Sequence, residues 1–321
     1  MSTVRIAMLR TIAIICAATF LAMPASAQTC SGVVDTLNFG TVNLAAGTTF
    51  DTSGALHVTC RGTPNTTVRV CQNIAAGSGG AASGNNPRYL TDGTNLLHFN
   101  IYKDVGHTTI WGSYAGRNTP LQIDLALNAS GTGSVSTQVF AQIAASQQGL
   151  PANIYTSNFA GGQASITYDY AAANTCATIG ASHETATPFE VSANDPKTCT
   201  LTASPLDFGS FTSTSAPHFG STTVTATCTS GTAYSISLNS GLNGTSSPMT
   251  RAMQFAANLL SYNLYKDSGH SQVWGDTGAD IVTGLTGTGS TQTLSVYGAV
   301  PIQTTPNPGT YRDFVIVTVT Y

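Results

Sequence analysis

Two copies of one sequence module fill most of this chain. The stretch 95–113 returns as 258–276, with eleven of nineteen positions identical. The flanking motifs repeat in the same order: 37–42 matches 206–211, 131–134 matches 287–290, and strand-like runs follow Tyr155 and Tyr311. Self-similarity at this spacing predicts two tandem domains that share one fold.

Residues 1–27 have the features of an export signal. Arg5 and Arg10 precede an apolar run over 12–23, and the small residues Ala25 and Ala27 mark a cleavage site. The run is too short and wrongly flanked for a membrane span. We therefore expect export through the inner membrane and a mature protein that begins near Gln28.

Composition predicts an all-β protein. Charged residues make up 8% of the chain and hydrophobic residues 41%, which is not the pattern of a disordered chain. Alternating runs such as 57–60, 224–228 and 234–238 are typical of half-buried strands. Each copy has about the size of a β-sandwich. The formal charge of −3 becomes −5 once the two signal arginines are removed, and this mildly acidic charge without a basic patch argues against a nucleic-acid partner.

The cysteines predict disulfides in place of a metal site. Cys16 leaves with the signal, and exported proteins oxidise their remaining cysteines. The second copy has only two cysteines, which must pair with each other, and their counterparts in the first copy pair likewise. No CxxC motif occurs and the histidines are scattered, so we expect no metal and no cofactor. The predicted bridges are Cys30–Cys60, Cys71–Cys176 and Cys199–Cys228.

The ordered set of motifs resembles the spore coat protein U domain family, which includes secreted subunits of archaic chaperone–usher pili of the Csu type. The motifs are Leu-x-Phe-Gly, a strand cysteine, Tyr-Lys-Asp before Trp-Gly, and a terminal Tyr-Arg-Asp-Phe-Val run. The resemblance implies immunoglobulin-like sandwiches that lack a final strand, which a periplasmic chaperone and then the next subunit donate. It places an N-terminal adhesin domain at 28–172, a linker at 173–198 and a pilin-like domain at 199–321.

The C-terminal run 314–321 is the predicted acceptor of the donated strand. Its alternate residues point to opposite faces, and an apolar strand at an open edge requires a partner chain. The alternative is a central strand already paired on both sides. The resemblance favours the open groove, whose interface with chaperone and donor comprises Phe314, Val315, Ile316, Val317, Val319 and Tyr321.

The N-terminus predicts a tip subunit. Only Gln28 and Thr29 separate the expected cleavage site from Cys30, which leaves no extension to donate to another subunit. The first module must then be complete alone or completed in cis. Phe189 and Val191 in the segment 173–198 are candidates for an in-cis strand, and a plain linker is the alternative.

Adhesion is expected from apolar loops of the first module. The stretches 42–47, 72–80 and 147–152 contain apolar residues, and the last two have more polar counterparts in the second copy. An exposed contiguous patch would bind an abiotic or host surface. The alternative is that these side chains pack into the sandwich. The predicted surface-binding residues are Leu44, Ile74, Leu150 and Pro151.

The repeated pair Asp104 and His107, with its counterpart Asp267 and His270, is a candidate for catalysis. A turn between two strands explains the same residues and explains why both copies have them. No Gly-x-Ser-x-Gly elbow, phosphate loop or calcium loop occurs. We predict no enzyme.

The function predicted from the sequence is that of a tip adhesin of a chaperone–usher pilus, which mediates surface attachment and biofilm formation at the cell surface. The expected partners are a periplasmic chaperone, an outer-membrane usher, the next subunit and the attachment surface. A lectin-like adhesin that binds a glycan is one alternative. A secreted structural coat or matrix protein is the other.

Overall fold

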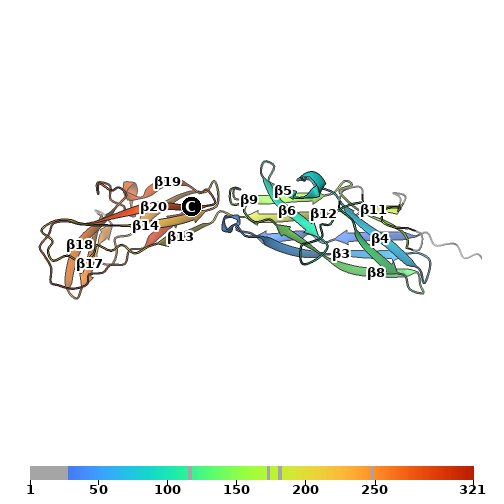
Figure 1. The fold of residues 1–321 in the computed structure, drawn as a ribbon, viewed down its shortest axis with the longest axis horizontal. Helices are drawn as coiled ribbons and strands as arrows, with labels where there is room; N and C mark the ends of the chain where they lie inside the picture. Colours follow the sequence, from blue (N-terminus) through green and yellow to red (C-terminus); the bar gives the residue numbers. More distant parts are fainter. Residues whose placement is uncertain (1–27, 115–117, 172–173, 180–182, 247–248) are drawn as a thin grey trace, which may run out of the picture.

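A computed structural model describes residues 28–114, 118–171, 174–179, 183–246 and 249–321. The predicted export signal lies outside these residues. The chain forms two β-sandwiches of immunoglobulin-like type that follow one another along the long axis (Figure 1). Each sandwich has its own buried apolar core, and the two cores are separate.

The N-terminal sandwich packs an eight-stranded sheet on a four-stranded one. In the four-stranded sheet the order is β11 (Glu184–Ala186), β10 (Ala164–Tyr170), β4 (Thr67–Ile74) and β7 (Leu121–Ala126). In the eight-stranded sheet it is β1 (Thr29–Val34), β3 (Phe50–Arg61), β8 (Thr132–Ile143), β6 (Leu96–Tyr102), β5 (Arg88–Thr91), β9 (Asn153–Phe159), β12 (Phe189–Asp195) and β2 (Leu37–Thr41). The short 3₁₀ turns are η1 (Leu44–Ala46) and η2 (Ser83–Asn85).

The C-terminal sandwich has the same plan with fewer strands. The larger sheet runs β13 (Cys199–Ala203), β14 (His218–Cys228), β20 (Thr291–Val300), β18 (Asn258–Tyr265), β17 (Met249–Phe255) and β16 (Thr245–Ser246). The smaller sheet runs β19 (Val282–Thr286), β15 (Ala233–Leu238) and β21 (Val317–Thr320), and a 3₁₀ turn, η4 (Gly278–Asp280), precedes β19.

Disulfides join neighbouring strands at the start of each sandwich. Cys30 lies opposite Cys60 in the β1–β3 ladder, and Cys199 lies opposite Cys228 in the β13–β14 ladder. These are the pairs that the repeat predicts. The two cross-links at the same position show that the domains are structural copies as well as sequence copies.

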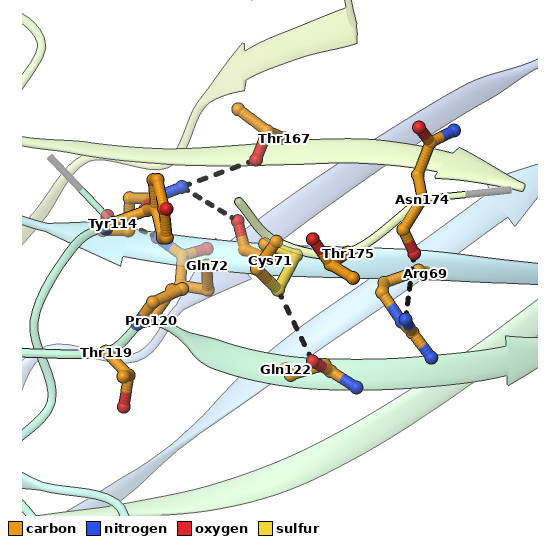
Figure 2. Close-up of a disulfide and its surroundings, with 12 residues drawn as sticks. Arg69, Cys71, Gln72, Tyr114, Thr119, Pro120, Gln122, Thr167, Asn174 and Thr175 are labelled. Carbon is orange, nitrogen blue, oxygen red and sulfur yellow. Dashed lines mark hydrogen bonds between the residues drawn. A yellow bond between two sulfur atoms is a disulfide. The ribbon is translucent and has the colours of Figure 1, made fainter. Parts of the chain in front are cut away.

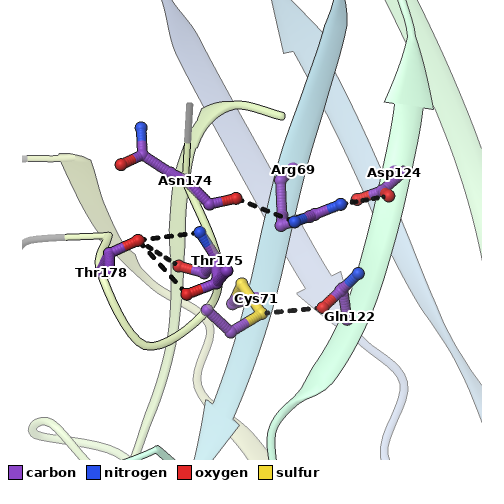
Figure 3. A network of polar contacts seen from close by, with 8 residues as sticks. Arg69, Cys71, Gln122, Asp124, Asn174, Thr175 and Thr178 are labelled. Carbon is purple, nitrogen blue, oxygen red and sulfur yellow. Dashed lines mark hydrogen bonds and ion pairs between the residues drawn. A yellow bond between two sulfur atoms is a disulfide. The ribbon is translucent and has the colours of Figure 1, made fainter. Parts of the chain in front are cut away.

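The third disulfide belongs to the N-terminal sandwich alone. It joins Cys71 of β4 to Cys176 in the segment 174–179, which crosses the outer face of the smaller sheet (Figure 2). Arg69 donates to the Asn174 carbonyl at 2.8 Å and forms a bidentate ion pair with Asp124 of β7 at 2.7 Å (Figure 3). Residues 174–176 are thus fixed covalently and by charge-assisted hydrogen bonds.

A buried arginine links the two sheets in each sandwich. Arg88 is fully buried and donates to the Ala75 and Trp111 carbonyls and to the Asn100 side chain, at 2.6–2.8 Å. Arg251 makes the equivalent contacts in the C-terminal sandwich, to Asn263 and to the carbonyls of Leu238, Asn239 and Trp274. Burial lowers the pKa of Arg88 to about 10, so the guanidinium remains charged at neutral pH.

Strand β12 comes from the segment expected as a linker. It pairs antiparallel with β9 over seven residue pairs and parallel with β2. Phe189, Val191 and Ala193 point into the core and are buried. The Phe189 ring stacks on Phe159 at 4.5 Å. The N-terminal sandwich is therefore completed by residues that follow β10 and β11 in its own chain.

The inward face of β12 ends on a buried carboxyl group. One oxygen of Asp195 accepts a hydrogen bond from the Leu44 amide at 3.1 Å, and the other has no hydrogen-bond partner among the described residues. Desolvation raises the pKa of Asp195 above its usual 3.8. The ionised form therefore destabilises the end of β12 that leads into the second domain.

Arg88→Met should lower the free energy of unfolding of the N-terminal sandwich by about 3 kcal/mol, because the Ala75 and Trp111 carbonyls and the Asn100 side chain each lose a hydrogen bond from a buried cation. Arg61→Met, at an exposed position of β3, is the matched control and should have little effect. Urea unfolding followed by Trp111 fluorescence, in a common Trp274→Phe background, measures both. Equal stability of the two variants would contradict the structural role of Arg88.

Asp195→Asn should reduce the pH dependence of stability. Because the folded-state pKa of Asp195 is raised, the free energy of unfolding is highest below the unfolded-state pKa and falls as pH rises through the folded-state value. The Asn variant loses this component, so its stability relative to wild type should increase between pH 3 and pH 7.

Asp124→Asn is the control with opposite sign. Arg69 lowers the pKa of Asp124, so this carboxylate contributes stability that is present at neutral pH and lost as pH falls. Thermal unfolding between pH 3 and pH 7 measures both variants. If stability depended on pH in the same way for Asp195→Asn and for wild type, the pKa of the Asp195 carboxyl group would not be raised in the folded protein.

Candidate strand-binding groove

In the described part of the C-terminal sandwich, no strand corresponds to β12. Residues 204–213 correspond to the region of β2, and residues 311–316 to β9. Neither segment forms a strand; one isolated bridge joins Arg312 to Gln254, as β9 joins β5. Among the described residues no strand lies between these two segments. β21, the counterpart of β10, pairs only with β15, whereas β10 has β4 on one side and β11 on the other.

The missing strand leaves apolar side chains only partly covered. Leu37 of β2, the strand beside β12, is fully buried, whereas its counterpart Leu206 is partly exposed. The same difference holds between Tyr155 and Tyr311. The partly buried residues that pack against the second core include Leu206, Phe208, Phe211, Met253, Tyr311, Val315, Val317 and Val319. Together they line an apolar groove, which we call the acceptor groove.

The main chain along the acceptor groove has few partners. The Gly209 amide donates to its near neighbour Asp207 at 2.8 Å, and the Ile316 amide donates to the Asn239 side chain at 2.8 Å. Phe314 donates to Asp313 at 2.8 Å. In the first sandwich the corresponding β9 forms a continuous ladder with β12. The acceptor groove therefore combines exposed apolar side chains with main-chain groups that lack a ladder.

The C-terminal residues alternate along this groove. Val315, Val317 and Val319 face the core and are partly buried, while Phe314 and Ile316 are 70% and 63% exposed on the other face. Tyr321, expected to face inward with the valines, is exposed because it lies beyond the last paired residue of β21.

The prediction of exposed apolar loops is wrong for Leu44 and Ile74. Leu44 is 2% exposed because η1 turns its side chain into the core, and Ile74 is 0% exposed because it ends β4 opposite Ala164. Leu150 is partly buried against the same core. Pro151 forms a parallel bridge with Ser230 of the second sandwich, so its loop faces the domain junction and not the outer end.

The loop 147–152, which we call the junction loop, is held by hydrogen bonds of a glutamine and a tyrosine. The same bonds recur in the second copy, and the sequence analysis did not predict them. Gln147 exchanges hydrogen bonds with the main chain of His98, and the Tyr155 hydroxyl donates to the Pro151 carbonyl at 2.6 Å. In the second copy Gln303 clamps Ser261, and the Tyr311 hydroxyl donates to the Asn307 carbonyl at 2.7 Å. The equal Gln-to-Tyr spacing in the two copies was the available signal.

The buried arginines were also missed. Arg88 and Arg251 each stand seven residues before the repeated stretch, and Asn100 and Asn263 occupy the same place within it. Identical spacing of an arginine and its amide partner in both copies would have identified the pair.

The repeated aspartate and histidine form a turn. Asp104 accepts from the Thr108 and Thr109 amides at 3.0 and 2.7 Å, and these bonds lower its pKa to about 2. Asp267 accepts from Ser271 and Gln272 in the same way, with a lowered pKa. His107 and His270 occupy the left-handed backbone region, with φ of 53° and 56°. Both copies therefore have the aspartate and the histidine because these residues form the same turn between two strands.

Within the described part of the chain, no group of three or more His, Cys, Asp or Glu side chains gathers as metal ligands. None of its helices is long and apolar enough to span a bilayer.

A solved structure shares the fold. A chain of the CsuC–CsuE chaperone–tip adhesion subunit pre-assembly complex, from archaic Csu pili of Acinetobacter baumannii, aligns with a TM-score of 0.52 at 17% identity, covering 91% of this chain and 100% of that chain. The CupB6 tip adhesin from Pseudomonas aeruginosa aligns with a TM-score of 0.40 at 12% identity, covering 91% and 94%.

Family comparison identifies the module. No curated protein matches the chain. The family model of the Spore Coat Protein U domain matches twice, over residues 16–161 and 185–318. The first range covers the N-terminal sandwich as far as β9, and the second begins within β11, includes β12 and covers most of the C-terminal sandwich. The chain therefore belongs to the Spore Coat Protein U domain family and has two copies of the domain in tandem.

Proposed function

We propose that this protein is the tip adhesin subunit of a chaperone–usher pilus, assembled through a strand that a partner donates to the acceptor groove. The observation that carries the proposal is the difference between the two copies. The first copy contains β12, and the second has an apolar groove at the same place. A strand from another chain supplies both the missing ladder and the missing apolar cover.

The partners follow from this geometry. An exported subunit with an exposed groove requires a periplasmic chaperone to cover it, and an outer-membrane usher then exchanges the chaperone for the next subunit. The structural likeness to a chain of a chaperone–tip adhesion subunit complex is consistent with such partners. The contact comprises Phe314, Val315, Ile316, Val317, Val319 and Tyr321, together with the partly buried residues of 206–211.

The position at the tip is supported by how the donated strand is used within the molecule. β12 and the three residues 196–198 connect the two sandwiches, so the first sandwich is completed in cis by the segment that leads into the second. The first sandwich is thereby complete and needs no partner. Its outer end is then the end of the fibre and the place where attachment occurs.

Two turns at the outer end of the N-terminal sandwich are polar. The turns 62–66 and 127–131 lie side by side there, joined by the Gly62 amide to Gly131 and the Asn65 amide to Asn128. Their exposed residues are Thr, Pro, Asn, Ala and Ser, with no large apolar side chain exposed in these two turns. This surface favours the second candidate, an adhesin for a glycan, over attachment through apolar loops.

Val319→Asp should prevent capture by the chaperone, because it places a charge in the acceptor groove where a donated strand must pack. Thr318→Asp, one residue earlier on the exposed face of β21, is the matched control and should be captured normally. Co-purification from a periplasm that expresses the cognate chaperone measures the difference. Equal capture of both variants would contradict strand donation at this groove.

Ala129→Arg should reduce attachment by cells that display the pilus, because it adds a bulky cation to the outer end. Ala160→Arg, at the exposed turn between β9 and β10, is the control and should leave attachment unchanged. Cell attachment is normalised to pilus amount on the cells. Unaltered attachment of the Ala129→Arg cells would place the adhesive surface elsewhere.

A further inference from the structure

We infer that the strand donated to the acceptor groove carries a large apolar residue and, four residues later, a small one, and that it runs antiparallel to 311–315. This inference rests on the proposed function, since it specifies the partner of that groove. β12 shows which side chains fit this place in the first sandwich. The second sandwich has the same buried arginine and tryptophan and the same tyrosine hydrogen bond, so the same fit is expected there.

The direction follows from the pairing of β12. Phe189 lies opposite Phe159 and Asp195 opposite Asn153, which makes β12 antiparallel to β9. On its other side Val191 lies opposite Leu37 in a parallel ladder with β2. The corresponding empty edges of the second sandwich are 309–315 and 206–211, so the same direction places a donor between them.

The first inward position requires a large side chain. Phe189 stacks between Phe159, at 4.5 Å, and Trp111, at 6.4 Å, with both ring planes within 7° of its own. In the second sandwich Trp274 is buried as Trp111 is, but Val315 stands four residues after Tyr311 where Phe159 follows Tyr155. The shorter valine leaves more space above the tryptophan, which a large apolar donor residue fills.

The third inward position requires a small side chain. Ala193 lies opposite Tyr155, whose buried ring is held in place by its hydroxyl bond to Pro151. Tyr311 is held by the equivalent bond to Asn307. Tyr155 leaves room beside it only for the methyl group of Ala193, and Tyr311, held by the same bond, stands at the same position in the second copy, so a small donor residue fits there.

The chain itself provides the probe. A labelled peptide of residues 187–198 is mixed with the mature protein, residues 28–321, during refolding from urea, and binding is measured by fluorescence anisotropy. Leu206→Asp in the protein blocks the acceptor groove and should abolish binding, which assigns the peptide to the second sandwich. The cis strand occupies the first sandwich at a much higher effective concentration.

Three peptide variants test the size pattern. Phe189→Ala and Ala193→Leu should each weaken binding about tenfold or more, the first by lost burial and the second by overpacking. Ser192→Leu is the matched control, because it adds a similar volume at the neighbouring outward position, and it should bind as the unchanged peptide does.

The outcomes are distinct. Binding of the unchanged and Ser192→Leu peptides, with loss in the other two, supports the inference. Equal binding of all four overturns the size pattern and leaves strand donation intact. Failure of every peptide, the unchanged one included, overturns the open groove itself and the proposed function with it.

Discussion

Main-chain pairing along β12 determines the difference between the two halves of this molecule. A strand in the middle of a sheet must form hydrogen bonds on both edges and cover the core beneath it. In the N-terminal sandwich β12 does both, between β9 and β2. Where it is missing, the flanking segments 204–213 and 311–316 form no strand, although 206–211 matches 37–42 at β2 in sequence and Tyr311 matches Tyr155 of β9.

The shared skeleton shows that the second sandwich is incomplete and not differently folded. Both copies have a buried arginine that binds an asparagine and a tryptophan carbonyl. Both also have a glutamine that exchanges hydrogen bonds with a neighbouring strand and a tyrosine hydroxyl that donates to a carbonyl of the preceding loop. Polar groups of this kind are costly unless every partner is in place. Because they are in place in both copies, the partial exposure of Leu206 and Tyr311 results from the missing strand alone.

The sequence was informative where a repeat or an alternation fixed the answer. The two domains, the disulfide partners and the two faces of 314–319 followed from the matched copies and from the period of two. The burial of the apolar loop residues could not be predicted in this way. Leu44 and Ile74 stand in glycine- and alanine-rich stretches, and whether such a residue faces water depends on strands distant in sequence. Asp195 was missed because nothing local distinguishes a buried carboxyl group from an exposed one.

The third disulfide has a mechanical consequence. A pull between the two sandwiches acts along β12, because the chain leaves the first sandwich at Asp195 and enters the second at Cys199. The seven residue pairs with β9 then carry the load together, in shear. If β12 slides out, the chain can extend only back to Cys176, whose bond to Cys71 anchors it to β4. The cross-link therefore limits how far the molecule lengthens before the rest of the sandwich bears the force.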